Sequence, residues 1–370
     1  MSRYDVIVVG AGAGGASAAY FLAAAGARVL VVEKSNLPRY KPCGGAMPRA
    51  TLDHFPFSFD TVVDCEPRGV VYCWQGGQPV RHALKGRPIA MVMREHFDSH
   101  ILGHAPANIW DGRAVRSVEE SEHDVRIVTE GGSTATADYL IAADGAASQV
   151  ARMVGLWRRR PLATAIEAEV TPDAATWERY AGRALFDFGV LPFGYLWIFA
   201  KKEHLSVGII CLKGKCTSIR QTLFQEMSHL GIDLAGARLH GHPVPLYQRP
   251  ERRGPARTLL VGDAAGLVDS FSGEGIRHAI VSGKMSAQAI LEGRPGDYSA
   301  RIERYARSML GPVRTVAGIF YRYPRFCFRF GMQSPGTTGL LANWLNGEAS
   351  KAQVMTGLLQ SVITGALRSK

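Results

Sequence analysis

Short apolar runs rich in β-branched residues flank a helical stretch at the start of the chain. Residues 4–10 read YDVIVVG, residues 11–26 are rich in alanine and glycine, and residues 27–33 read ARVLVVE. Continuous apolar runs of this kind are typical of parallel strands that are covered on both faces. The pattern therefore predicts a strand, a helix and a second strand that form one βαβ unit.

Further strand and helix patterns follow along the chain. Residues 108–144 predict a small meander that returns to the first sheet, whereas strand-like stretches within residues 162–212 predict an antiparallel sheet. Residues 258–263 again have the pattern of a strand, residues 275–291 that of a helix, and residues 300–370 read as helical. We therefore expect an α/β fold whose first domain is assembled from discontinuous segments.

Composition narrows the class of protein. The 370 residues are 46% hydrophobic and 20% charged, which indicates a globular chain and excludes a disordered or collagen-like one. Six cysteines without a CxxC pair favour a reducing compartment over a zinc ribbon or a thioredoxin-type pair. Residues 6–27 carry no charge and are long enough to span a membrane, but their five glycines favour a buried strand and helix. The net charge of +11 is expected to attract anions.

A glycine-rich turn lies between the first strand and the first helix. It contains Gly10, Gly12, Gly14 and Gly15. Such a turn lets the backbone approach a diphosphate, which then faces the amides at the helix N-terminus. Glu33, about twenty residues further on at the end of the second strand, can accept hydrogen bonds from the ribose hydroxyls of an adenosine. These residues predict a site for FAD or NAD.

A second glycine-rich turn favours FAD over NAD. The predicted strand at 258–263 ends at Gly262-Asp263, and a turn with Gly273 and Gly275, followed by Ile276, opens the next predicted helix. An aspartate at this place can accept a hydrogen bond from a ribityl hydroxyl, which NAD lacks, and the helix N-terminus can face the flavin pyrimidine edge. The alternative role for the aspartate is a helix N-cap. Because the turn accompanies a dinucleotide motif, we interpret it as a flavin contact.

YLIAADG at Tyr139–Gly145 and LVGDAAG at Leu260–Gly266, together with the first glycine turn, resemble motifs of FAD-dependent oxidoreductases of the aromatic-hydroxylase type. Arg39–Gly45, Tyr195–Gly208 and Gly273–Ile276 resemble more specifically motifs of the geranylgeranyl reductase family. RYKPCGG at Arg39–Gly45 resembles that family's PxxxCGG loop, and YLWIFAKKEHLSVG at Tyr195–Gly208 resembles its YxWxFPKxxxxxVG signature. GEGI at Gly273–Ile276 completes the pattern.

Two places depart from this family pattern. Ala200 stands where the signature has proline, and Asp269-Ser270 replaces an Asn-Pro pair that commonly precedes the Gly-Glu-Gly turn. Because proline fixes φ, the backbone at both places is expected to be less restrained. The two departures weaken the inference about the substrate, and they do not affect the inference of a flavin-binding fold.

The resemblance implies a loop and an arginine at the cofactor. Cys43, Gly44 and Gly45 are expected beside the flavin, with Cys43 on the substrate side of the ring, although a free cysteine is more often a small buried hydrophobe. Arg94 opens REHFDSHIL, which resembles a family segment whose arginine lies near the ribityl and phosphate groups. The alternative is an exposed arginine at a helix start.

An aromatic stripe follows in the signature. Tyr195, Trp197 and Phe199 share one face of the predicted strand because alternate residues point the same way. Such a stripe is typical of a sheet core, and by resemblance it also forms part of an apolar channel for an isoprenoid chain. Tyr195 and Trp197 join Cys43 as catalytic candidates, and no metal site is expected.

The resemblance implies an FAD-dependent reductase that saturates carbon–carbon double bonds of a polyprenyl chain, in an isoprenoid lipid or a prenyl diphosphate. The sequence holds no second GxGxxG motif, so we expect the electron donor to be transiently bound NAD(P)H or a ferredoxin-like protein. The alternatives are a flavin-dependent monooxygenase or halogenase of an aromatic substrate, and a non-catalytic flavin-bound lipid carrier.

A basic and aromatic segment bears on location. Residues 301–330 hold seven arginines and one glutamate among aromatic residues, which suits an anionic membrane surface or a diphosphate head group better than a nucleic acid. The alternative is an ordinary helix bundle that covers the active site. We therefore expect a cytoplasmic protein with peripheral contact at the inner face of the membrane, and no nucleic-acid partner. The expected domains are a Rossmann-type FAD-binding domain (1–60, 85–155 and 245–299), an antiparallel-sheet substrate domain (61–84 and 156–244) and a helical C-terminal region (300–370).

Overall fold

The computed structural model describes residues 2–84, 86, 89–248 and 257–333, together with positions 340, 353, 356, 357, 359, 360 and 363. The chain divides into two compact units, which are described separately below. Unit 1 comprises Met1–Lys41, Arg94–Arg160 and Pro245–Gly311, and unit 2 comprises Pro42–Met93, Pro161–Val244 and Pro312–Lys370. This division places residues 42–60 with the substrate-domain strands rather than with the predicted FAD-binding domain.

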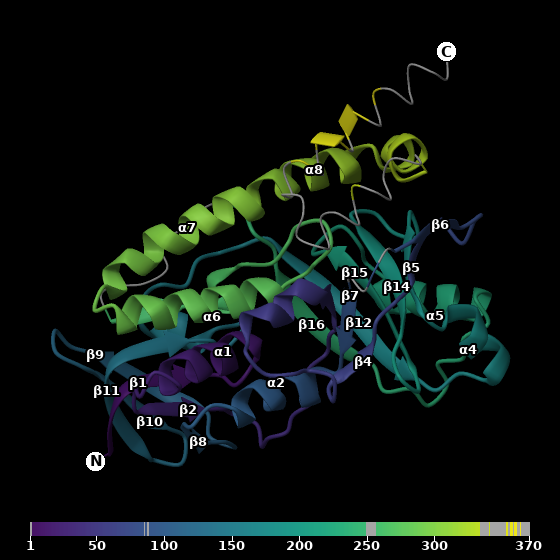
Figure 1. Cartoon of the computed structure of the whole chain (residues 1–370). Helices are drawn as coiled ribbons and strands as arrows, with labels where there is room; N and C mark the ends of the chain where they lie inside the picture. The colour runs from purple at the N-terminus through teal and green to yellow at the C-terminus, as the bar shows by residue number, and fades with distance from the viewer. Residues whose placement is uncertain are drawn as a thin grey trace. The chain divides into compact units, whose positions relative to one another are not determined.

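Unit 1 contains a seven-stranded sheet in the order β8-β2-β1-β11-β10-β9, with β17 paired to β11 (Figure 1). Strands β8, β2, β1, β11 and β17 run parallel, and β9 to β11 form an antiparallel meander, as predicted. The core strands are apolar because the sheet is covered on both faces. The strands are β1 (Ser2–Val9), β2 (Val29–Val32), β8 (Asn108–Trp110), β9 (Val115–Glu120), β10 (Val125–Thr129), β11 (Thr134–Ala142) and β17 (Thr258–Leu260).

Helices α1 and α6 lie side by side in unit 1 (Figure 1). A Cβ atom added at Gly283 of α6 would lie 2.3 Å from the Gly14 carbonyl oxygen of α1, so the two backbones touch. This contact explains the small residues that fill the first helix. The unit 1 helices are α1 (Ala13–Ala23), α2 (Arg94–Gly103), α3 (Gln149–Met153), α6 (Ile276–Leu291) and α7 (Tyr298–Met309), with 3-10 turns η2 (Gly262–Ala265) and η3 (Pro295–Asp297).

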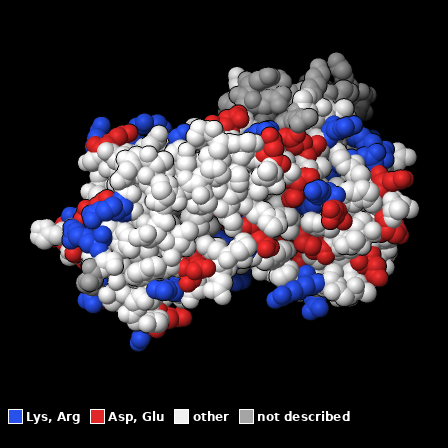
Figure 2. All heavy atoms as spheres, turned by 60° about the horizontal axis from the view of Figure 1, so that its bottom comes forward, with Lys and Arg blue, Asp and Glu red and all other residues white. Residues whose placement is uncertain are grey.

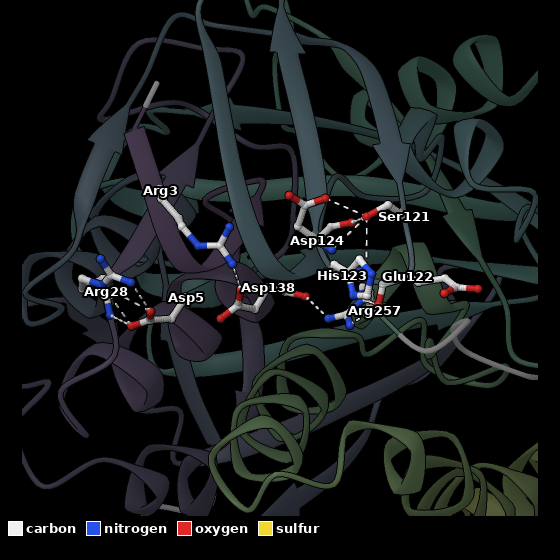
Figure 3. A network of polar contacts seen from close by, with 9 residues as sticks. All are labelled: Arg3, Asp5, Arg28, Ser121, Glu122, His123, Asp124, Asp138 and Arg257. Carbon is white, nitrogen blue, oxygen red and sulfur yellow. Dashed lines mark hydrogen bonds and ion pairs between the residues drawn. The ribbon is translucent and has the colours of Figure 1, made fainter.

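Exposed charged side chains form a network of polar contacts in unit 1 near the amino end of β1 (Figure 3). Arg3 pairs with Asp138 of β11 at 2.6 Å, and Arg28 pairs with Asp5 at 2.6 Å. Arg257 donates to the Asp138 carbonyl at 3.0 Å and to a carbonyl of the β9–β10 turn. Exposed pairs of this kind contribute ~0–1 kcal/mol each. The network joins residues near the amino end of β1 to the meander, whereas the glycine turn follows the carboxyl end of β1.

Unit 2 contains a seven-stranded sheet in the order β16-β12-β15-β14-β13-β5-β6 and a three-stranded sheet in the order β3-β7-β4. Strands β12 to β15 form the predicted antiparallel sheet, but β13 pairs with β5 in parallel. A parallel pair is allowed because a long segment of chain separates these strands. The strands are β3 (Ala46–Pro48), β4 (Val63–Cys65), β5 (Gly69–Trp74), β6 (Val80–Ala83), β7 (Ile89–Val92), β12 (Leu162–Val170), β13 (Arg183–Phe188), β14 (Gly194–Ala200), β15 (Leu205–Leu212) and β16 (His240–Pro245).

One face of the large sheet of unit 2 forms a hydrophobic core. Leu196 and Ile198 of β14 belong to the same buried cluster as Leu223 and Met227 of α5. Alternation then places Tyr195, Trp197 and Phe199 on the opposite face, as predicted. The unit 2 helices are α4 (Ala174–Tyr180), α5 (Ile219–His229), α8 (Gly311–Arg322) and α9 (Pro324–Cys327), with a 3-10 turn η1 (Arg49–His54) and a π-helical turn η4 (Phe328–Met332).

The helical C-terminal region is confirmed as far as residue 332, and most of the remaining prediction falls outside the described residues. Within the described part, no helix combines the length and the hydropathy that a membrane crossing needs. Basic and acidic side chains are interspersed on the face drawn in Figure 2, so the net charge of +11 does not gather there in one patch.

Candidate active site

The glycine turn of unit 1 follows β1 at the carboxyl edge of the parallel strands. Gly10 has a φ of +102°, and a Cβ atom added there would lie 2.4 Å from the Ala143 carbonyl oxygen. A Cβ atom at Gly15 would lie 1.9 Å from the Gly10 carbonyl oxygen. Neither position accepts a side chain without movement of the backbone. The turn thus has the close approach that a dinucleotide site requires.

The N-terminus of α1 faces two arginines. Its N-cap residue is Gly12, which has no side chain with which to cap the first amides. A Cβ atom added at Gly12 would lie 3.3 Å from Arg39 Nη2 and 3.7 Å from Arg94 Nη2. Helix amides and two guanidinium groups together favour an anion with several oxygens, such as a diphosphate. Arg94 thus lies beside the first glycine turn and is buried rather than exposed, and its contact with the cofactor stays a prediction. Arg39 is a second cation that the prediction did not include.

Carboxylates orient both arginines. Arg94 donates to Asp98 through Nε at 2.9 Å and Nη2 at 2.8 Å, in a bidentate pair four residues apart on α2. Arg39 Nε lies 3.3 Å from Glu33 Oε2, and Arg39 Nη2 lies 3.6 Å from Asp98 Oδ2. All four side chains are largely buried, so their positions are fixed before an anion binds. Asp98 was not predicted, although its spacing from Arg94 is a signal that could have identified it.

Glu33 lies directly beside the glycine turn. Its Oε2 accepts a hydrogen bond from the Ala11 amide at 2.8 Å, and its Oε1 accepts one from the Ser35 amide at 3.1 Å. Its residue exposure is only 4%. The carboxylate is thus held at the end of β2, next to the turn that would receive the diphosphate. Contact with a ribose remains a prediction.

The second glycine turn is adjacent to the first. A Cβ atom at Gly275, the N-cap residue of α6, would lie 3.4 Å from Asp263 Oδ1, which brings the aspartate against this turn. Gly273 has a φ of +68°, and Ile276 begins α6. A Cβ atom at Gly14 would lie 3.2 Å from the carbonyl oxygen of Ala279, so α1 and α6 begin close together. Both glycine turns of the predicted cofactor site therefore lie in unit 1, whereas the predicted cofactor residues Cys43, Gly44 and Gly45 belong to unit 2.

The buried side chain of His278 connects the second glycine turn to α7. His278 Nδ1 lies 2.7 Å from the hydroxyl oxygen of Tyr305, and His278 Nε2 lies 3.3 Å from Glu274 Oε2. Glu274 Oε1 in turn accepts a hydrogen bond from the Arg277 amide at 2.9 Å. These contacts fix the glutamate of the Gly-Glu-Gly turn. The sequence pattern does not predict these contacts, because Tyr305 belongs to another helix, α7.

In unit 2, the predicted cysteine loop rests on the aromatic stripe of β14. A Cβ atom at Gly44 would lie 2.8 Å from the Phe199 ring and 3.2 Å from Trp197 Nε1. Gly45 has a φ of +74°, and its amide donates to Cys43 Sγ at 3.4 Å. Two motifs more than 150 residues apart in the sequence therefore meet at one place.

The stripe belongs to a wider aromatic surface. The Tyr195 ring lies 5.5 Å from that of Phe186 on β13, and the Phe188 ring lies 5.1 Å from that of Phe320 on α8. Trp197 is 6% exposed, and no acceptor for its indole N–H is found in the described part of the chain. A buried donor without a partner is rare in proteins and points to a ligand or a water molecule. Within the described residues, no group of three or more potential ligands could hold a metal ion.

Known proteins resemble this chain in sequence and in fold. A family profile described as pyridine nucleotide-disulphide oxidoreductase matches residues 4–175. Geranylgeranyl diphosphate reductase of Rhodobacter capsulatus is 31% identical over 80% of this chain and 78% of its own. Digeranylgeranylglycerophospholipid reductase of Thermoplasma acidophilum is 28% identical over 82% of each chain. The crystal structure of a geranylgeranyl bacteriochlorophyll reductase-like protein from Thermoplasma acidophilum superposes with a TM-score of 0.79 at 22% identity, over 97% of this chain and 96% of the other.

The fold and the two glycine turns define an FAD-dependent oxidoreductase. The chain belongs to the geranylgeranyl reductase family, as the similarity to the Rhodobacter enzyme shows. A flavin-dependent brominase also superposes with a TM-score of 0.74, but at 18% identity this likeness concerns the fold alone.

Proposed function

We propose that this protein is an FAD-dependent reductase that saturates double bonds of a polyprenyl chain. The observation that carries the proposal is the contact of Gly44 with Trp197 and Phe199 in unit 2. It joins two of the three motifs that resemble those of the geranylgeranyl reductase family. The relatives named above as reductases of geranylgeranyl chains support the same substrate class.

Unit 1 fits the FAD half of this proposal. Gly10, Gly12 and Gly15 allow the diphosphate close to the α1 amides, while Arg39 and Arg94 neutralise its charge. In addition, Glu33 would bind the adenosine ribose, and Asp263, Gly273, Gly275 and Ile276 would bind the ribityl chain and the pyrimidine edge. FAD, when bound and reduced, supplies the hydride.

Unit 2 fits a hydrocarbon substrate. The aromatic surface around Tyr195 and Trp197 offers a wide apolar contact, and each CH₂ group that a prenyl chain buries gains ~0.8 kcal/mol. An isolated double bond offers little charge to polarise, so orientation and exclusion of water must lower most of the barrier. One alkene carbon receives the hydride, and the other receives a proton from Cys43 Sγ, from water or from a nearby acid.

The function is tested by incubating the purified holoenzyme without oxygen, with dithionite as reductant, and with geranylgeranyl diphosphate or a digeranylgeranyl glycerophospholipid. Mass spectrometry of the extracted lipid should show two added hydrogens for every double bond reduced. An unchanged lipid would contradict the reductase assignment and favour a carrier. A reaction that requires oxygen and an aromatic substrate would instead support a monooxygenase or halogenase. Replacing dithionite by NADH, NADPH or a reduced ferredoxin then identifies the electron donor.

The role of Cys43 is tested separately. We expect Cys43→Ala to lower the turnover number of the FAD-loaded enzyme, because the loop is predicted to lie beside the flavin on its substrate side. Cys216→Ala, at another partly buried cysteine of the same unit, is the matched control. Equal turnover in both variants would remove Cys43 from the catalytic candidates.

We further propose contact with an anionic membrane. Ile319 and Tyr323 near the end of α8 and Phe326 of α9 are 38%, 60% and 46% exposed, and Arg322 and Arg325 beside them are exposed as well. Arginine next to exposed aromatic residues suits an anionic lipid surface. The protein should therefore sediment with vesicles that contain phosphatidylglycerol and not with pure phosphatidylcholine. Sedimentation with neither would contradict the proposal.

A further inference from the structure

Lys201 directly follows β14, and its ammonium group lies buried against the cysteine loop. Its Nζ donates to the Gly44 carbonyl at 2.7 Å and to the Val92 carbonyl at 2.8 Å. Only 2% of the residue is exposed. Val92 ends β7, the strand that pairs with β3 immediately after the loop. One ammonium group therefore joins the cysteine loop, β7 and the end of the aromatic strand.

The backbone of the loop is shaped around this side chain. A Cβ atom at Gly45 would lie 2.4 Å from Lys201 Nζ and 2.0 Å from the Val92 carbonyl oxygen. Gly45 also has a φ of +74°, which other residues rarely adopt. Its carbonyl accepts a hydrogen bond from the Val92 amide at 3.2 Å. The absence of a side chain at Gly45 thus lets the ammonium approach the loop from within the unit.

The charge of Lys201 is compensated inside unit 2. Burial lowers the pKa of its ammonium, and the carboxylate of Glu169 on β12 opposes that effect most strongly, followed by Cys43. Glu169 Oε2 also lies 2.8 Å from His204 Nε2, and the Lys201 amide donates to the His204 carbonyl at 2.8 Å. A buried cation is tolerated when it is paired and hydrogen-bonded. Such a costly arrangement would be unnecessary if the loop only had to cover the sheet.

We infer that Lys201 is a positioning residue, which acts through the Gly44 and Val92 carbonyls to hold the Cys43–Gly45 loop at the prenyl-binding face. This inference rests on the proposed function for its catalytic consequence. The contact of Lys201 Nζ with the Gly44 and Val92 carbonyls is called the clamp below, and its existence rests only on these two hydrogen bonds and the burial of the ammonium. The two parts are therefore tested by separate measurements.

The clamp is tested by amide hydrogen exchange in full-length holoprotein. Lys201→Met keeps a long apolar side chain but removes both donors, and Lys202→Met makes the same change at the exposed neighbouring residue. Amides of residues 43–47 and 90–92 should exchange at least ~10-fold faster in Lys201→Met and within ~2-fold of wild type in Lys202→Met. Exchange in α1 should be unchanged in both. Equal exchange of the loop in the two variants would overturn the clamp.

A second measurement needs no variant and applies even if Lys201→Met does not fold. Native wild-type protein is treated with an amine-acylating reagent, and the modified lysines are mapped by mass spectrometry. Lys202 should react at the rate of an exposed lysine and Lys201 at least ~100-fold more slowly. Similar rates at the two residues would show that the ammonium is not held in the buried position.

The effect of the clamp on catalysis is measured by determining kcat and KM separately. In FAD-saturated enzyme, Lys201→Met should lower kcat at least ~10-fold, while KM for the prenyl substrate stays within ~3-fold of wild type and the far-ultraviolet circular dichroism is unchanged. A general loss of structure would instead change all three. Unchanged kcat would refute the positioning role. If wild-type protein reduces no prenyl substrate, the proposed function fails, while hydrogen exchange and acylation still decide on the clamp.

Discussion

Asp187→Asn should change how the stability of unit 2 depends on pH. Asp187 lies on β13 and is 1% exposed. Its Oδ2 accepts a hydrogen bond from the Gly76 amide at 2.8 Å, whereas Oδ1 is buried with no partner among the residues whose placement is described. Burial raises the pKa of this carboxyl to about 6, an effect that the hydrogen bond from Gly76 opposes and the charge of Glu226 reinforces.

The direction of the effect follows from proton binding. Because the folded chain binds this proton more tightly than the unfolded chain, the contribution of Asp187 to stability is greatest in acid and falls as the pH rises from 3.8 to about 6. At 1.36 kcal/mol per pH unit, the full loss is roughly 3 kcal/mol. Asparagine has a similar shape, does not ionise, and keeps an oxygen for the Gly76 amide.

The assay is urea denaturation followed by circular dichroism at several values between pH 4 and pH 8. The free energy of unfolding of Asp187→Asn, relative to wild type, should rise by about 2 kcal/mol between pH 4 and pH 7.5. Asp60→Asn replaces an exposed aspartate of the same unit and should show a constant difference from wild type. A constant difference for Asp187→Asn as well would refute the reasoning that burial controls this carboxyl.

Three further substitutions test the site. Arg94→Met removes one of the two guanidinium groups at the α1 N-terminus and should raise the dissociation constant for FAD, measured by fluorescence titration, by ~10- to 100-fold. Arg126→Met removes an exposed arginine and should leave this constant unchanged. Gly10→Ala forces a Cβ atom to 2.4 Å from a carbonyl oxygen at a positive φ, so it should lower the unfolding free energy by ~1–3 kcal/mol and reduce FAD loading. Gly44→Ala should push the loop away from Phe199 and lower kcat/KM of the FAD-loaded enzyme by ~10-fold or more.

The sequence predicted those parts of the structure that depend on local pattern. The apolar runs around the first glycine turn predict β1, α1 and β2 because a parallel strand and a small-residue helix each have a distinctive composition. The positions of Gly10 and Gly275 followed from the same reasoning, since a turn and a close approach both require glycine. The family resemblance added the cysteine loop and the aromatic stripe. Their contact in the structure could not be derived from spacing alone.

The partners that orient the site were harder to predict because they come from distant segments. Arg39 belongs to the RYKPCGG motif, but nothing in the local sequence shows that its guanidinium reaches Gly12 and Asp98. Lys201 likewise stands in the strand signature, where its residue type predicts exposure rather than burial. Tyr305 meets His278 only because α7 packs beside α6. In each case the contact depends on tertiary packing that no periodicity encodes.

The two departures from the family pattern show how hydrogen bonds can replace the restraint of proline. Ala200 pairs with Leu205 in the β14–β15 ladder and is 1% exposed, so the strand remains regular up to Lys201. Asp269 Oδ1 accepts hydrogen bonds from the Phe271 amide at 2.7 Å and the Ser272 amide at 3.0 Å.

The serine of the same pair adds a further restraint, because Ser270 Oγ donates to the Tyr247 carbonyl at 2.8 Å. An aspartate that accepts from amides two and three residues ahead stabilises a turn much as a fixed φ does. The segment that leads into Gly273 and Gly275 is therefore restrained by side-chain contacts, at the place where the family pattern described above has proline. The cofactor half of the site can in this way keep its geometry while the sequence around it changes.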